Sequence, residues 1–173
     1  MNRSAVIDAL DRIDLLSAEI NANVPASNSS LLGFRSDLAG LLNVTICATY
    51  ENCVKLILHE YAGRQSSLFQ IYTKNQYDRI NSRIDINDLH KYAKTFHPDI
   101  NKDFKIRLKK TSEFFLNRTA GDIIKSYSQL LEWRHDFAHT GQRVTTVEEV
   151  TKHHRMGKRV ILLFSDAFSS YPL

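Results

Sequence analysis

The sequence predicts an all-α fold, and three observations support this prediction. Glycine and proline are scarce, at 6 and 3 of 173 residues, which disfavours the many tight turns of a β protein. Apolar residues recur at three- and four-residue spacing along most of the chain, as one face of a helix requires. The hydrophobic share of 43% and the charged share of 24% are typical of globular chains, so we expect one domain over residues 1–173.

The first two helices are predicted from apolar periodicity and from the loop between them. A first helix should be capped by Ser4 and should end before the loop NVPASNSS (23–30). The next helix spans 31–61, is apolar over more than half of its circumference, and has Gly63 as a C-terminal stop. The inward positions of the first helix are Val6, Leu10, Ile13, Leu16 and Ile20. We therefore expect a bundle built around a long, central second helix.

Two shorter helices are expected at 66–83 and 87–96. The second should end at His97, because a residue that precedes a proline is pushed out of the α region. A basic helix should follow over 101–116.

The C-terminal part of the chain predicts two more helices. Residues 121–137 form the first of them. Thr146 and Glu149 have the spacing of a capping box, which predicts a last helix running to about Phe168.

The cysteines and the N-terminus indicate the compartment. Cys47 and Cys53 lie in one predicted helix with their Cα atoms about 9 Å apart, beyond disulfide reach, so we expect buried thiols. Acidic residues at 8, 11 and 14 interrupt the apolar run that a secretory signal needs, and no run of about 18 apolar residues suggests a membrane span. We expect a cytoplasmic protein without membrane contact.

Positive charge is concentrated in the middle of the chain, where residues 61–120 hold twelve Lys and Arg against six Asp and Glu. Within KDFKIRLKK (102–110), Lys102, Lys105 and Lys109 share one helical face. Such a face suits a polyanion such as RNA, although a solvated amphipathic helix has the same pattern. Arg155 and Lys158, which follow His153 and His154, either extend an RNA surface or belong to another solvated face.

The segment WRHDFAHTG (133–141) groups an arginine, two histidines and an aspartate. On an unbroken helix Arg134 and His139 would point about 140° apart and could not face one phosphate. The helix must therefore end or bend between them, or a second subunit must contribute. Gly141 predicts an end that leaves His139 just outside the last turn, and His135 should lie near His139.

An exposed arginine and imidazole suit one reaction class in particular. Cleavage of RNA by its own 2′-hydroxyl needs an acid or base that titrates near neutrality and a fixed positive charge at phosphorus. It needs neither a metal nor a protein nucleophile, so we expect no cofactor.

The motif RHDFAH (134–139) resembles the R-polar-x-x-x-H signature of the HEPN superfamily. These small all-α domains include metal-independent endoribonucleases of toxin–antitoxin, phage-defence and RNA-processing systems. LLEWRHDFAHTG is similar to the form LxxxRNxxAHG, with His135 where asparagine is frequent and Thr140 inserted before the glycine. The stretch 34–62 resembles the long second helix of the RiboL-PSP-type branch, and the likeness spans roughly residues 30–168.

The resemblance implies a homodimer in which the motif helices of two protomers form one composite cleft. It implies that His139 is the acid or base, that Arg134 binds the scissile phosphate, and that His135 orients the phosphate. Glu51 on the second helix and Asp136 are possible supporting residues. An alternative for Glu51 is a simple i, i+4 pair with Lys55. The resemblance further implies RNA as substrate and an antitoxin or defence-system protein as a possible partner.

Two other functions fit the same residues. His135 and His139 have the spacing of a helical zinc pair, with Asp136, His153 and His154 as further donors, although no H-E-x-x-H is present. A HEPN-like module that binds RNA or protein without cleaving it is the second alternative, because His135 departs from the frequent asparagine. A plain polar helix end would explain each residue singly but not their grouping.

Overall fold

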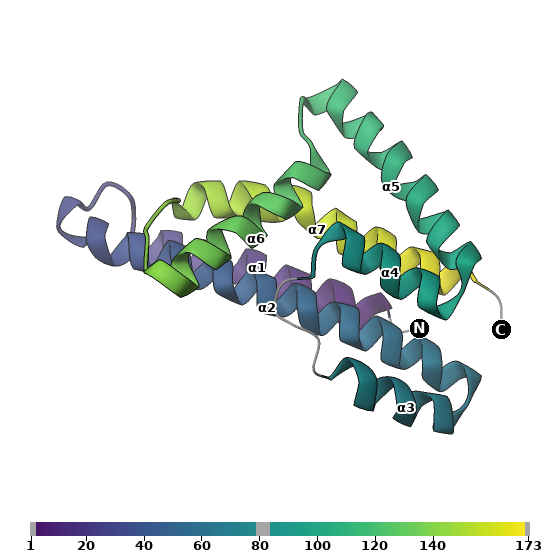
Figure 1. Ribbon diagram of the computed structural model, residues 1–173. Helices are drawn as coiled ribbons and strands as arrows, with labels where there is room; N and C mark the ends of the chain where they lie inside the picture. Colours follow the sequence, from purple (N-terminus) through teal and green to yellow (C-terminus); the bar gives the residue numbers. More distant parts are fainter. Residues whose placement is uncertain (1–2, 79–83, 172–173) are drawn as a thin grey trace.

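The computed structural model describes residues 3–78 and 84–171, and these residues form seven α-helices, one short 3-10 helix and no strand (Figure 1). The all-α prediction is confirmed. In chain order the elements are α1 (Arg3–Asn23), η1 (Ser29–Leu31), α2 (Leu32–Gln65), α3 (Ser67–Tyr77), α4 (Ile86–Phe96), α5 (Pro98–Thr119), α6 (Ile123–Thr140) and α7 (Val147–Ser170).

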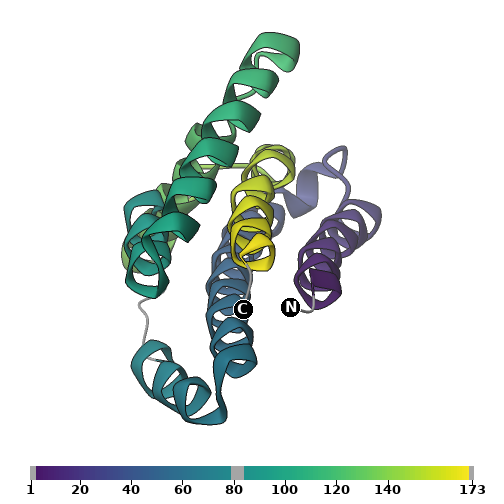
Figure 2. The ribbon, with the colours of Figure 1, turned by 90° about the vertical axis from the view of Figure 1, so that its right-hand side faces the viewer.

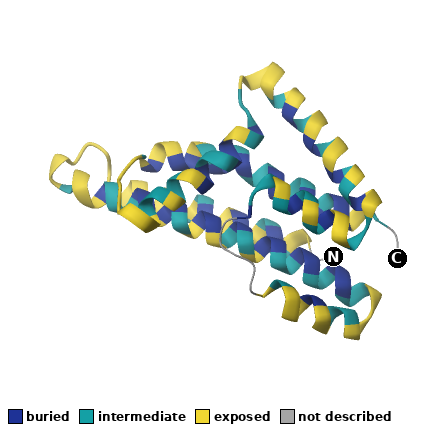
Figure 3. Ribbon diagram, viewed as in Figure 1, coloured by how far each residue is buried: buried dark blue, intermediate teal, exposed yellow. Residues whose placement is uncertain are grey.

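The long second helix is the centre of the bundle, as predicted. Helix α2 packs against α1, α3, α6 and α7, while α5 leans away from the other helices at its far end (Figures 1 and 2). Buried residues follow the facing sides of these helices (Figure 3). At the centre the Tyr50 ring stacks on Tyr127, with 5.5 Å between centroids, and the Tyr50 hydroxyl lies 3.1 Å from Nδ1 of His154.

The apolar character of α2 serves this packing. By length and composition alone the segment Ser29–Gln65 could cross a membrane, so the expectation that no segment is apolar enough was wrong. Its fully buried residues include Ile46, Val54 and Ile57, which belong to the core shared with the neighbouring helices. A central bundle helix and a membrane span thus give the same average composition.

Two predicted helix ends differ from the structure. Ser4 is not the cap of α1, because the helix already includes Arg3, and the Ser4 hydroxyl donates to Asp8 instead. Gly63 does not stop α2, which continues to Gln65. A Cβ at Gly63 would lie 2.5 Å from the Gln70 side chain, so the glycine permits close packing of α3.

Ser66 separates α2 from α3. Its backbone is extended and its hydroxyl accepts a hydrogen bond from the Phe69 amide, so this residue caps the start of α3. The predicted helix 66–83 is shorter in the structure and ends at Tyr77. Positions 79–83 lie outside the described residues.

Other ends follow the sequence signals. Thr146 and Glu149 form the predicted capping box of α7, with both reciprocal hydrogen bonds present. His97 ends α4 as expected and caps α5, whose first residue is Pro98. Helix α6 continues through Thr140, three residues beyond the predicted end at 137, and this extension alters the geometry of the motif.

The end of α6 is held against α2 at a glycine. A Cβ at Gly40 would lie 2.1 Å from the Phe137 ring, so only glycine allows this ring to sit on α2. We expect Gly40→Ala to lower the free energy of unfolding by about 1–3 kcal/mol, because the ring must move. Gly33→Ala on the same helix is the matched control, since its Cβ would meet only Arg143 at 3.8 Å. Thermal unfolding followed by circular dichroism measures both, and equal Tm values would contradict this packing.

Candidate functional site

The motif lies on one continuous helix. Helix α6 runs unbroken from Ile123 to Thr140 and ends at Gly141, whose φ of 66° is left-handed. The prediction that His139 lies just outside the last turn was therefore wrong, and so was an end or bend between Arg134 and His139. These two side chains leave the same helix about 140° apart.

Inward-facing residues fix the orientation of the motif helix. The Trp133 ring meets His153 of α7 edge-on at 4.9 Å, and Phe137 lies over Gly40 of α2. One turn earlier, the carbonyl of Leu130 accepts a hydrogen bond from Nδ2 of Asn43 at 3.0 Å. The packing of α6 on two helices therefore determines which motif residues face outward.

His135 and His139 lie on the opposite side of the helix from these anchors. Each follows an anchor by two positions, which is a rotation of about 200°. Both histidines are exposed, and their ring centroids are 4.5 Å apart, so the predicted proximity is confirmed. Two imidazoles are thus presented together at the end of α6.

Arg134 lies nearer to α2 than the histidines do. It is half-buried, and its positive charge acts on the Cys47 thiol. Burial raises the pKa of Cys47 to about 12, and the nearby Arg134 only partly opposes this effect, so the thiol stays protonated. Asp136 is also half-buried, and its backbone carbonyl accepts the Thr140 hydroxyl at 2.6 Å.

Glu51 is not close to the motif within one chain. Its neighbour Tyr50 stacks on Tyr127, which precedes His139 by twelve residues, or about 18 Å along α6. The Glu51 carboxylate instead accepts a hydrogen bond from Nζ of Lys55 at 2.6 Å. The simple i, i+4 pair is therefore the arrangement found, and Glu51 leaves the candidate site.

The lysines of α5 are exposed but distant from the motif. Lys102, Lys105 and Lys109 lie on the outer face of α5, as the pattern predicted. A hydrogen bond of 3.0 Å joins Arg107 of this helix to Ser170, the last residue of α7. Helix α7 starts beside the end of α6 and is about 36 Å long, so the basic face and the motif lie near opposite ends of it (Figure 1).

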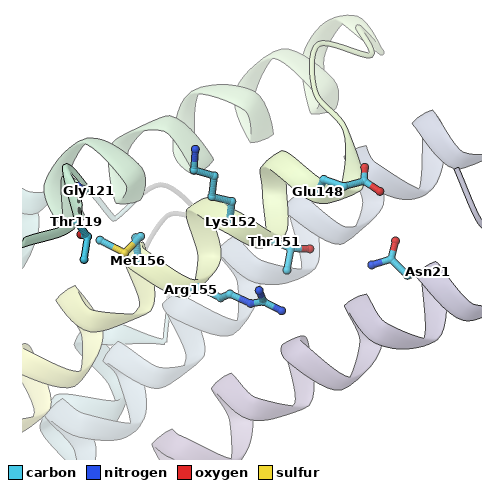
Figure 4. Close-up of a pocket in the computed structure, with 8 residues that line it drawn as sticks. All are labelled: Asn21, Thr119, Gly121, Glu148, Thr151, Lys152, Arg155 and Met156. Atoms are coloured by element: carbon cyan, nitrogen blue, oxygen red, sulfur yellow. Dashed lines mark hydrogen bonds between the residues drawn. The ribbon is translucent and has the colours of Figure 1, made fainter. Parts of the chain in front are cut away.

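The basic residues of α7 differ in their surroundings: Lys158 is ion-paired, whereas Lys152 and Arg155 are exposed. Nζ of Lys158 lies 2.6 Å from Asp14 and 3.3 Å from Asp11, so two carboxylates of α1 neutralise it and it leaves the candidate RNA surface. Arg155 is exposed. With Lys152 it lines a cavity of about 440 Å³ between α7, the end of α1 and the turn before α6 (Figure 4).

The part of this cavity lined by Lys152 is nearer to the motif than the lysines of α5 are. Figure 4 shows Lys152 pointing toward α6 and Arg155 lying over the side of α7 that faces α1. Lys152 precedes His153, which touches Trp133 of the motif helix. The position of Lys152 becomes informative once α6 and α7 are known to pack together.

Neither histidine of α7 adds positive charge. His154 is completely buried, and burial lowers its pKa to about 4, so it belongs to neither a solvated face nor an RNA surface. Burial, and then the charge of Lys152, lower the pKa of His153. Among the described residues, no three His, Cys, Asp or Glu side chains are grouped to hold a metal, so the zinc hypothesis lacks a third donor within one chain.

The loop after the motif is fixed by an ion pair that the sequence did not reveal. Nε and Nη2 of Arg143 lie 2.6 and 2.7 Å from the two carboxylate oxygens of Asp37. The two residues are 106 positions apart, so no spacing rule connects them. This bidentate pair joins the loop to the first turns of α2.

Comparisons with known proteins agree with the architecture. The model of the family described as RiboL-PSP-HEPN matches residues 7–170, which include the whole of every helix from α2 to α7. No curated protein and no solved structure gives a significant match. The match also covers most of α1, which the resemblance seen in the sequence did not include.

Proposed function

Because the chain belongs to the RiboL-PSP-HEPN family, we propose that it is a metal-independent endoribonuclease. The observation that supports this best is the presentation of two exposed imidazoles, 4.5 Å apart, together with Arg134 on one rigid helix end. Imidazole is the side chain best suited to exchange protons near pH 7, and arginine carries a permanent charge.

In the proposed reaction, the 2′-oxygen of a ribose forms a bond to phosphorus while the bond from phosphorus to the 5′-oxygen breaks. One imidazole accepts the 2′-hydroxyl proton or donates a proton to the leaving 5′-oxygen, and water exchanges the other proton. His139 is this acid or base. Arg134 binds the phosphate as negative charge increases on it, and His135 orients the phosphate. The products carry 2′,3′-cyclic phosphate and 5′-hydroxyl ends.

The site requires two copies of the chain. Since Arg134 and His139 diverge on one helix, we propose that Arg134 of one protomer and His139 of the other act on the same phosphate in a two-fold dimer. Exposed apolar residues near the start of α2, Phe34 and Leu41, are more than half exposed in the single chain and offer surface for such contact.

We further propose that this ribonuclease acts as a toxin or phage-defence effector. In that role the nuclease would be restrained by another molecule, such as an antitoxin or a defence-system protein. That partner would bind at or beside the exposed end of α6. Family membership supports this role.

Cleavage of mixed RNA in the presence of EDTA tests the activity. We expect cutting to continue under chelation, and we expect a single 2′-deoxy substitution at a mapped cleavage position to abolish cutting there, because the nucleophile is then missing. Mass spectrometry of the fragments reads the ends. Cleavage that survives the 2′-deoxy substitution would instead indicate a water nucleophile, as in metal-assisted hydrolysis.

A non-catalytic RNA- or protein-binding module is the second candidate. The observation that favours it is the divergence of Arg134 and His139 in a single chain, which leaves a monomer without a complete site. The same experiment separates the two functions. Binding of RNA without any cleavage, both with and without EDTA, would support the non-catalytic binding module.

Salt dependence distinguishes the two basic surfaces. Because Lys152 and Arg155 lie closer to the motif than the lysines of α5, we expect Lys152→Glu with Arg155→Glu to flatten the dependence of RNA affinity on salt. The matched control is the double variant Lys105→Glu with Lys109→Glu, which should change the slope less. Fluorescence anisotropy at several salt concentrations measures both, and the reverse order would place the RNA along α5.

A further inference from the structure

A second cavity lies between α3 and α4, away from the motif. Its volume is about 490 Å³, which falls in the range of small-molecule sites. Helix α3 meets α2 near Gly63, whereas the motif helix meets α2 at Gly40. Helix α3 runs back along α2 as far as Lys55, whose ammonium donates to the Asp78 carbonyl, and Lys55 is about 22 Å from Gly40 along α2, so the cavity is separate from the candidate site.

Aromatic side chains dominate the lining of this cavity. Tyr77 meets Tyr92 edge-on at 5.4 Å and Phe96 at 5.8 Å, which connects the two helices. The rings of Phe69 and Tyr72 differ in plane by only 17°, with 6.4 Å between centroids, so their flat faces point in nearly the same direction. We call this space the aromatic cavity. Its aromatic residues are Phe69, Tyr72, Tyr77, Tyr92 and Phe96.

One of these rings is available to a ligand. Tyr72 is 58% exposed although it lines the cavity, so it lies at the rim. A ligand ring can stack on it without displacing other side chains. A large exposed aromatic ring beside a cavity is the usual platform for a flat ligand.

Polar groups in the aromatic cavity suit a heterocycle more than a hydrocarbon. Thr73 lines it and is 1% exposed, and its hydroxyl has no hydrogen-bond partner among the described residues. A buried hydroxyl without a partner is costly, and a ligand with ring nitrogen or carbonyl groups can supply one. Gln76, also in the lining, adds an amide that can donate and accept.

The charge at the rim favours an anionic group on the ligand. Lys91 is exposed and lines the cavity. Burial, and then the nearby Asp88 carboxylate, raise the pKa of Tyr92 to about 12, so its phenol is neutral and Lys91 is the cavity-lining cation that can pair with a phosphate.

We propose that the aromatic cavity binds the base of a nucleotide, with the base stacked on Tyr72 and Phe69, its polar edge toward Thr73, and a phosphate near Lys91. The base comes either from an RNA strand or from a free nucleotide. In the RNA case the proposal rests on the proposed function, and the cavity then holds a base far from the cleaved phosphate.

Binding to the full-length His139→Ala variant tests the proposal without cleavage. The probes are AMP, UMP and a short unstructured RNA, measured by isothermal titration calorimetry. Tyr72→Ala should weaken binding roughly five- to hundredfold, the range reported for removal of one stacking ring. Thr73→Val keeps the side-chain shape, removes the unpartnered hydroxyl, and should also weaken binding. Leu68→Ala, at a residue of α3 that is 78% exposed and outside the cavity, is the control.

The outcomes separate the sources of the base. Mononucleotide binding that weakens in Tyr72→Ala supports a free nucleotide, and RNA binding that weakens while mononucleotides do not bind supports an RNA base. The proposal is overturned if no probe binds, or if Tyr72→Ala and Thr73→Val bind as Leu68→Ala does. Because cleavage is not measured here, an inactive enzyme would not affect this result.

Discussion

Replacing either Arg134 or His139 with alanine should lower the RNA-cleavage rate by about 100-fold or more. His139→Ala removes the group that exchanges the proton, and Arg134→Ala removes the charge that stabilises the phosphorane. His135→Ala should have a smaller effect, because that ring orients the phosphate without taking its proton. Initial rates on one defined RNA, at equal protein concentration, measure all three.

Folding and dimerisation must be controlled in this series. His139 is exposed at the end of α6, so its loss should leave the circular dichroism spectrum unchanged. Arg134 is half-buried, and Arg134→Lys therefore serves as a second variant that keeps the charge. His59→Ala, on the part of α2 far from the motif, is the histidine control. A His139→Ala protein that cuts at the wild-type rate would remove the imidazole from the mechanism.

The fold could be predicted from the sequence because its signals are local. Apolar spacing gave the helices, and the capping residues Thr146 and Glu149 gave the start of α7. The errors occurred where tertiary contacts override local preference. Gly63 was predicted to stop α2, yet it lies inside the helix, where it allows Gln70 to approach.

The candidate site could be predicted only in part. The motif residues were found because they are contiguous, and the proximity of His135 to His139 follows from helical spacing. The surrounding charges could not be assigned, since their state depends on residues far away in sequence. Lys158 looked like an RNA-binding residue until Asp11 and Asp14 of α1 were found against its ammonium group.

Mixing two inactive variants should restore cleavage if the site is shared between protomers. In a heterodimer, the His139→Ala protomer keeps Arg134 and the Arg134→Ala protomer keeps His139. These two intact residues face each other and form one complete Arg134–His139 pair. Random exchange makes about half of the dimers mixed, and in each mixed dimer one of the two Arg134–His139 pairs is intact. Roughly a quarter of the wild-type rate should therefore return. The variants are mixed, unfolded together and refolded, and the rate is compared with that of each variant treated alone.

The helix geometry makes this result discriminating. Arg134 and His139 diverge by about 140° on an unbroken α6, so a pair within one protomer cannot account for restored activity when each protomer lacks one member. No restoration, in a mixture that sedimentation shows to contain dimers, would mean that both residues must come from the same chain. Sedimentation that finds only monomers at micromolar concentration, with full wild-type cleavage, would refute the shared site more directly, because the single chain would then bring Arg134 and His139 to one phosphate by bending α6 between them.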